Sequence, residues 1–157
     1  MNMKFEVKQI GVIHSPYKIK DECPIQGYIY NNILGQIELY PEYIDGLETI
    51  ESFSHIILFY IFDKAGEMKL SRPTFLDDDS HGVFASRHPC RPNNIGISTV
   101  KLEGIVKNKL IVSGIDVLDG TPLIDIKPYV PRFDYFSDAN NGWIESTKNR
   151  PKPKDRE

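Results

Sequence analysis

Short stretches in which apolar and polar residues alternate recur along the whole chain. The first covers Phe5–Ser15 and is stopped by Pro16. Two more, Ile97–Val106 and Lys109–Ile115, are joined by a tight polar turn and predict a β-hairpin. A fourth covers Pro122–Tyr129 and predicts another strand. Since no stretch predicts a helix of more than a couple of turns, the pattern favours many short strands in a barrel or a sandwich.

The middle of the chain contains stretches with other patterns. Tyr28–Tyr40 predicts one extended or hairpin element, and Pro41–Glu51 predicts a short helix or two turns. The most apolar run, His55–Phe62, is rich in β-branched and aromatic residues and predicts a fully buried central strand. Leu70–Gly82 is rich in Pro, Asp and Ser, and we expect a loop that is disordered or that moves with substrate.

The candidate chemistry is concentrated in the stretch Gly82–Leu102. An apolar run over Val83–Ala85 predicts a strand, and Arg87 and Arg91 then follow among prolines. Because proline fixes φ and biases the preceding residue towards extended geometry, we expect a stiff loop between two strands. Arginine forks and asparagine amides suit an anion or a heteroaromatic edge. The alternative is an ordinary proline-rich surface loop.

Composition limits the class of protein. A chain of 157 residues with 40% hydrophobic and 26% charged residues is typical of one globular domain. No run approaches the ~18 apolar residues of a membrane helix, and the N-terminus lacks a signal-peptide pattern, so we expect a cytoplasmic protein. The two cysteines, Cys23 and Cys90, are too few for a disulfide framework. The net charge of −3 is unusual for a protein that binds nucleic acid, which generally uses a basic face.

Two other kinds of site are disfavoured. Asp77–Asp79 and His81 suggest a metal site, but adjacent carboxylates cannot all face one ion without a shaped loop, so we expect a solvated acidic loop and no metal. The glycine-rich GxGxxG pattern is absent, which argues against a Rossmann methyltransferase or dehydrogenase.

Two long motifs resemble those of one protein family. The stretch GVFASRHPCRPNNIGISTVKL is similar to the motif GVFATRSPxRPNPIGLSxVKL of the TsaA/TrmO-like family, and VLDGTPLIDIKPYVP matches the second signature, LDGTPxxDIKPYxP. The resemblance extends to about Tyr135. Members of the TsaA/TrmO-like family are S-adenosylmethionine-dependent tRNA methyltransferases with a β-barrel fold. The resemblance thus implies a mainly β, single-domain, barrel-like antiparallel fold with one or two short helices and long functional loops.

The resemblance also implies a set of cofactor contacts. Pro24–Gln26 stands where the family has a Pro-x-Gln element, but Ile25 replaces the common arginine, so only backbone contact is expected there. Asp63 stands where the family often has histidine, and for it and Lys64 a polar strand cap is the alternative. The Asp-Gly-Thr turn allows close backbone approach. The expected contacts with S-adenosylmethionine are Pro24, Ile25, Gln26, Asp63, Lys64, Arg87, Ile97, Ser98, Leu118, Asp119, Gly120 and Thr121.

The acceptor implied by the resemblance is N6 of threonylcarbamoyladenosine, next to the anticodon of tRNA. Because this nitrogen carries a proton, a base or polarising partner is expected, and Asp116, Asp125 and Tyr129 are the candidates. Both aspartates could instead brace loops. Arg91 and Asn93 are candidates for binding a tRNA phosphate or the threonylcarbamoyl carboxylate, with a structural role as the alternative. Another acceptor, or cofactor binding without turnover, remains open.

The resemblance finally implies how the chain is organised. Residues 1–136 are expected to form the β-barrel domain, and residues 137–157 a flexible basic tail. Many bacterial members continue into a separate C-terminal domain, which is expected to be missing here. The expected partners are the anticodon loop of tRNA and a second copy of the chain, because family members are homodimers whose cofactor site is completed across the interface.

Overall fold

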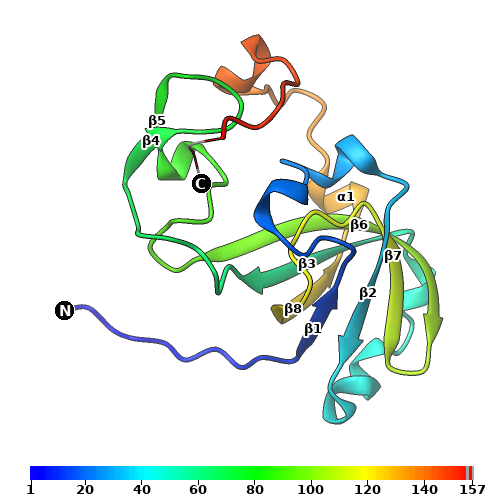
Figure 1. The fold of residues 1–157 in the computed structure, drawn as a ribbon. Helices are drawn as coiled ribbons and strands as arrows, with labels where there is room; N and C mark the ends of the chain where they lie inside the picture. Colours follow the sequence, from blue (N-terminus) through cyan, green and yellow to red (C-terminus); the bar gives the residue numbers. More distant parts are fainter. Residues whose placement is uncertain (155, 157) are drawn as a thin grey trace.

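A closed six-stranded antiparallel barrel forms the centre of the computed structural model, which describes residues 1–154 and 156 (Figure 1). Around the barrel the strands follow the order β1, β2, β7, β6, β3 and β8. Their bounds are Gly11–His14 for β1, Leu34–Leu39 for β2, His55–Ile61 for β3, Ile95–Val106 for β6, Lys109–Ser113 for β7 and Thr121–Pro128 for β8. Ser71–Pro73 (β4) and Ser80–Gly82 (β5) form a separate two-stranded sheet. The predicted mainly β, barrel-like fold is confirmed.

The helices are all short. Within the described residues the one α-helix, α1, covers Pro131–Asp134. The 3-10 helices are η1 Lys20–Glu22, η2 Gly27–Tyr30, η3 Pro41–Leu47, η4 Ile50–Ser52, η5 Val83–Ala85 and η6 Gly142–Ser146. The turns expected over Pro41–Glu51 are therefore confirmed. Tyr28–Tyr40 is not one extended element, because η2 occupies its start and only β2 is a strand.

Alternate strand residues fill the barrel. In β3, Ile56, Leu58 and Tyr60 face inward and are at most 3% exposed, whereas the residues between them are half-buried. The prediction that this strand is buried on both faces is wrong, because its other face forms the outer surface of the barrel. Each inward isoleucine or leucine contributes about 1.5–3 kcal/mol of burial free energy, so these side chains hold the barrel together.

The long strand β6 pairs with β3 along its first half and with β7 along its second half, and a bulge interrupts the second pairing. Leu102 lies opposite Val112 but Gly104 lies opposite Ile111, so Glu103 is an extra residue in β6. The Glu103 carboxylate accepts a hydrogen bond of 2.7 Å from the Ser113 hydroxyl, which fixes the bulge. Bulges of this kind bend a strand and help a sheet to close.

The first strand is shorter than predicted. β1 begins at Gly11, and residues 1–9, here called the N-terminal arm, lead away from the barrel (Figure 1). Phe5 and Val7 are 81% and 59% exposed. Alternation predicts which face a strand presents, but it does not ensure that a neighbouring strand exists within the same chain. The arm therefore leaves an apolar stripe in solvent.

The β4–β5 sheet and the C-terminal segment lie together at one end of the molecule (Figure 1). Trp143 stacks on His81 with ring centroids 3.7 Å apart, and its indole N–H donates to the Ala85 carbonyl at 2.8 Å. Arg150 and Arg156 donate to the Asp78 carboxylate at 3.1 and 2.7 Å. Residues 70–82, for which a loop was predicted, contain the two short strands β4 and β5. The domain boundary at residue 136 stays a prediction.

The apolar run before the loop of residues 86–94, here called the central motif, is also different from the prediction. Val83–Ala85 forms η5 and not a strand, and only Val83 is buried while Phe84 is 80% exposed. Three apolar residues do not distinguish a strand from a helical turn, and here the Ser86 amide donates back to the Val83 carbonyl at 3.3 Å.

Candidate functional site

One end of the barrel brings together the loop after β1, the start of β6 and the loop between β7 and β8. The Ser98 hydroxyl, on the inner face of β6, donates to one oxygen of Asp116 and lies 2.8 Å from the Tyr60 hydroxyl. The other Asp116 oxygen accepts the Gly27 amide at 3.0 Å. Asp116 therefore links the barrel interior to the turn that follows Pro24–Gln26.

The Asp116 carboxylate is electrostatically unusual. Burial raises its pKa to about 6, even though the hydrogen bonds from Ser98 and Gly27 and the charge of Arg87 act in the opposite direction. Burial, with a smaller contribution from the Asp116 charge, also raises the pKa of Tyr60. Perturbed carboxyl groups of this kind cluster at functional sites, although structural networks also produce them.

Gln26 and Arg87 meet at the same end of the barrel, although they are far apart in the sequence. The Arg87 guanidinium donates to the Gln26 side-chain oxygen at 3.2 Å, and the Gln26 amide donates to the Ile25 carbonyl at 2.8 Å. Gly27 packs so closely that an added Cβ would lie 1.9 Å from the Gly114 carbonyl oxygen. The turn is therefore held by backbone packing. The exposed Arg87, paired with the half-buried Gln26, is accessible to a ligand.

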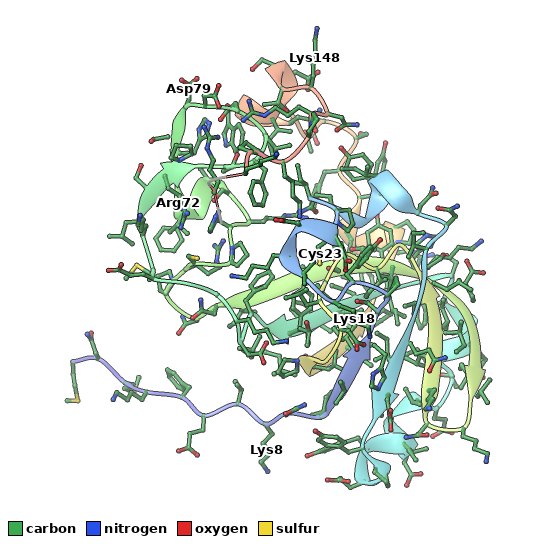
Figure 2. All side chains as sticks on the ribbon, viewed as in Figure 1. Lys8, Lys18, Cys23, Arg72, Asp79 and Lys148 are labelled. Atoms are coloured by element: carbon green, nitrogen blue, oxygen red, sulfur yellow. The ribbon has the colours of Figure 1, made fainter. Side chains whose placement is uncertain are left out.

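The loop after β1 carries further groups that the sequence did not identify as important. Lys18 and Cys23 both belong to it (Figure 2). Burial raises the pKa of the Cys23 thiol to about 11, so this thiol is protonated and unreactive at neutral pH. Lys152 donates to the Lys20 carbonyl at 2.8 Å and lies 5.1 Å from the Phe75 ring centre, which ties the C-terminal segment to this loop.

The Asp119–Thr121 turn braces the end of β1. The Asp119 carboxylate accepts the Ser15 amide at 3.0 Å and pairs with Lys18 at 2.5 Å, and the Lys18 interaction is the main reason that its pKa is lowered. Gly120 has φ +83°, a value that favours glycine, and its amide donates to the Ile13 carbonyl. The Thr121 hydroxyl donates to the carbonyl of the partly buried Leu118 at 2.6 Å.

These contacts lead to a stability prediction for Asp119. We expect Asp119→Ala to lower the free energy of unfolding by ~1–3 kcal/mol, because the largely buried Ser15 amide loses its acceptor. Lys18→Ala removes only an exposed ion pair and should cost less than ~1 kcal/mol. Chemical denaturation measures both. If Asp119→Ala is as mild as Lys18→Ala yet abolishes cofactor binding, the carboxylate is a ligand contact and not a brace.

The remaining expected cofactor residues lie around this end in different ways. Asp63 and Lys64 are exposed in the turn after β3, next to the central motif because the Phe62 amide donates to the Asn94 carbonyl at 2.8 Å. Ile97 and Ser98 point to opposite faces of β6, and Ile97 is 39% exposed whereas Ser98 is 5% exposed. The main-chain contacts with the cofactor that are expected of these two residues stay a prediction.

The central motif forms a loop, as predicted. The Arg91 guanidinium donates to the carbonyls of Ser86 and His88 at 2.9 and 3.4 Å, which are the loop hydrogen bonds described by the structural alternative. Asn94 has φ +51° and its side chain donates to the Pro89 carbonyl at 2.8 Å. Asn93 is exposed. Any RNA contact by Arg91 would have to use guanidinium donors that the loop does not occupy.

Of the three candidate bases, Asp116 lies at the Gln26–Arg87 end of the barrel. Asp125 is paired with Lys127 at 3.5 Å and lines a cavity of about 310 Å³ beside η3 and η4. Tyr129 follows β8 and its ring packs edge-on against His55. That cavity and a second one of about 250 Å³ contain no residue of the expected cofactor set.

The acidic loop and the helices give two further findings. Asp77 pairs with His81 at 2.9 Å while Asp78 pairs with the C-terminal arginines, and the described residues contain no group of three metal-ligating side chains. Among all the residues that the structure describes, no helix is long and apolar enough to span a membrane.

Comparison with known proteins places the chain in a family. The profile of the tRNA-methyltransferase O N-terminal domain matches residues 12–135. A Pyrococcus abyssi protein named "Probable S-adenosyl-L-methionine-binding protein" is 48% identical over 88% of this chain and 75% of its own length. The tRNA (adenine(37)-N6)-methyltransferase of Escherichia coli is 37% identical, over 90% of this chain and 65% of its own length. A crystal structure of TrmO superposes with a TM-score of 0.78 at 42% identity, and covers 89% of this chain and 64% of TrmO. The chain belongs to the tRNA-methyltransferase O N-terminal domain family.

Proposed function

We propose that this protein is an S-adenosylmethionine-dependent methyltransferase that modifies N6 of threonylcarbamoyladenosine beside the anticodon of tRNA. One observation carries the proposal: Gln26, Arg87 and Asp116, from three separate segments, converge at one end of the barrel. This is the end to which the two family motifs contribute. The names of the relatives from Pyrococcus abyssi and Escherichia coli support the cofactor and the reaction.

The residues at this end suit a zwitterionic cofactor. S-adenosylmethionine, when bound, supplies the methyl group from its sulfonium. The exposed Arg87 guanidinium is suited to its carboxylate, the Gln26 amide to a polar edge, and the ionised Asp116 to a positive charge nearby. The backbone of the Asp119–Thr121 turn is a further proposed contact, while its side chains brace the barrel. For Pro24, Ile25, Asp63, Lys64, Ile97 and Leu118 a cofactor contact stays a prediction.

Asp116 is the proposed acceptor of the N6 proton. A carboxylate offers about four lone-pair directions, and Ser98 and Gly27 use two of them. With a pKa of about 6 the group is mostly ionised at neutral pH, yet it is more basic than an ordinary aspartate. Fixing the acceptor nitrogen and the methyl group in line accounts for much of the catalysis in such a transfer.

We also propose that two copies form a homodimer through the outer face of β3 and β6 and that the protein works in the cytoplasm. Ile95 and Ile97 are 43% and 39% exposed, and each lies directly opposite an apolar residue of β3, Ile61 or Phe59. An outer sheet surface of this composition is typical of an interface. Since Ile97 is also an expected cofactor contact, a partner on this face would adjoin the cofactor.

Transfer of radiolabelled methyl groups to tRNA tests the proposed function. We expect label in tRNA that carries the threonylcarbamoyl group and none in tRNA that lacks it, with activity falling as salt rises because RNA binding depends on phosphate contacts. A thermal shift with S-adenosylhomocysteine measures cofactor binding separately. Binding without label in either tRNA would contradict the tRNA reaction and favour cofactor binding alone, which is all that the name of the Pyrococcus relative states.

A further inference from the structure

We propose that the hydroxyl of Tyr60, acting through Ser98, stabilises the ionised Asp116 carboxylate that the methyl transfer needs. This proposal rests on the proposed function, in which Asp116 is the base and Tyr60 has no role. Tyr60 lies in β3, Ser98 lies in β6, and Asp116 follows β7. Their side chains form one chain of hydrogen bonds inside the barrel. Tyr60 is therefore a positioning residue, because it acts through another side chain.

The direction of this hydrogen-bond chain follows from the charge of Asp116. An ionised carboxylate only accepts hydrogen bonds, so the single hydroxyl proton of Ser98 points to Asp116. The Ser98 oxygen then accepts the hydroxyl proton of Tyr60 at 2.8 Å. The Ile97 carbonyl is 3.5 Å from the Tyr60 oxygen, which is the limit of a hydrogen bond, so Ser98 is the main acceptor.

Burial strengthens the effect of Tyr60 on the carboxylate. Tyr60 and Ser98 are 3% and 5% exposed, so little water competes for their hydroxyl groups. In such an interior, successive hydrogen bonds polarise one another, and the bond from Tyr60 makes Ser98 a better donor. Because a hydrogen bond to an ionised group is stronger than one to a neutral group, Tyr60 favours the ionised form of Asp116 over the protonated form.

The packing around the Tyr60 ring holds its hydroxyl against Ser98. Gly96 lies directly opposite Tyr60 across β3 and β6, and a Cβ added to Gly96 would lie 2.1 Å from the Tyr60 ring. The absence of a side chain at Gly96 therefore lets the ring cross β6 towards Ser98. Phe62 packs edge-on against the same ring, with ring centroids 5.2 Å apart. The fold thus fixes the position of the hydroxyl.

Three ionisable groups interact with the Asp116 charge, and none of them changes charge while Asp116 titrates. These groups are Arg87, Cys23 and Tyr60. Burial raises the pKa of the Cys23 thiol to about 11 and also raises the pKa of Tyr60 above its usual value. Both groups are therefore neutral between about pH 5 and pH 9, and the arginine stays charged. A titration in this range reports Asp116.

Tyr60→Phe tests the proposal, because it keeps the ring and removes only the hydroxyl. The Asp116 carboxyl is followed by NMR in protein with ¹³C-labelled aspartate, and its signal is identified by its loss in Asp116→Asn. We expect the midpoint of the Asp116 titration to rise by about half to one pH unit, because the ionised form loses a hydrogen bond. Tyr43→Phe is the matched control and should leave the midpoint unchanged, since Tyr43 lines the cavity beside η3 and η4.

Single-turnover methyl transfer to threonylcarbamoylated tRNA provides the second readout. We expect the rate of Tyr60→Phe to fall about two- to fivefold near pH 6 and to reach the wild-type rate near pH 8.5, where Asp116 is ionised in both proteins. An unchanged midpoint, or a rate that falls equally at every pH, would overturn the proposal. If the midpoint rises but tRNA is not methylated, only the proposed function fails. If tRNA is methylated but neither the midpoint nor the pH profile moves, only the role of Tyr60 fails.

Discussion

Gly27→Ala is expected to abolish tight cofactor binding and to destabilise the fold. The new Cβ would lie 1.9 Å from the Gly114 carbonyl oxygen and 2.9 Å from its carbon, and backbone atoms cannot move aside as a side chain can. The turn would have to shift, which breaks the hydrogen bond from the Gly27 amide to Asp116 and displaces Gln26 from Arg87. Overpacking of this kind costs about 1–3 kcal/mol of unfolding free energy. We expect the affinity for S-adenosylhomocysteine to fall at least tenfold.

Gly46→Ala is the matched control for this prediction. Gly46 lies in η3, and a Cβ added there meets nothing within 4 Å. Isothermal titration with S-adenosylhomocysteine and thermal unfolding should therefore give wild-type values for this variant. If Gly27→Ala behaves like Gly46→Ala in both measurements, the close packing of Gly27 on Gly114 does not position the turn at residues 24–27. The proposed site then loses its main structural support.

Local patterns predicted the elements whose neighbours are close in the sequence. The hairpin of β6 and β7 was predictable because alternation on both strands is joined by a turn, in which Lys107 takes φ +57°. The stiff loop was predictable because prolines restrict φ wherever they occur. In this loop the Arg91 guanidinium donates to backbone carbonyls, as the structural alternative for this residue describes.

Features that depend on distant neighbours could not be predicted in this way. The apolar composition of β3 suggested that both of its faces are buried within the chain. In the structure only the inward face is buried, and the residues of the outer face are half-buried. The arm has the apolar–polar alternation of a strand, with Phe5 and Val7 at alternate positions. Alternation alone does not reveal that no strand of the described residues pairs with the arm. The Asp116 network joins Gly27, Tyr60 and Ser98, and only closure of the barrel brings these residues together. Tyr60 was not predicted to take part in this network, because it lies within the apolar run His55–Phe62.

Asp116→Asn is expected to remove a pH dependence from both stability and activity. The pKa of Asp116 is about 6 in the folded protein against 3.8 for an ordinary aspartate, so the folded state holds its proton more tightly. The favourable contribution is complete below pH 3.8 and is lost as the pH rises through 6. Two pKa units correspond to about 3 kcal/mol. The wild type should thus lose up to this amount of unfolding free energy between pH 4 and 7, and Asp116→Asn should not, as denaturation at several pH values will show.

Activity separates a base at this position from a structural carboxyl group. An asparagine can keep the geometry, because its oxygen accepts the Gly27 amide while its nitrogen donates to Ser98. If Asp116 accepts the N6 proton, methyl transfer to threonylcarbamoylated tRNA rises with pH through about 6 in the wild type. It should fall by about 10²–10⁴-fold in the variant. Affinity for S-adenosylhomocysteine should change little, because this product lacks the sulfonium charge of the cofactor. Ser98→Ala, which removes the other hydrogen bond but keeps the carboxylate, should retain most activity with a shifted pH profile. Full activity of Asp116→Asn at every pH would limit Asp116 to bracing the turn, and catalysis would then depend on positioning alone.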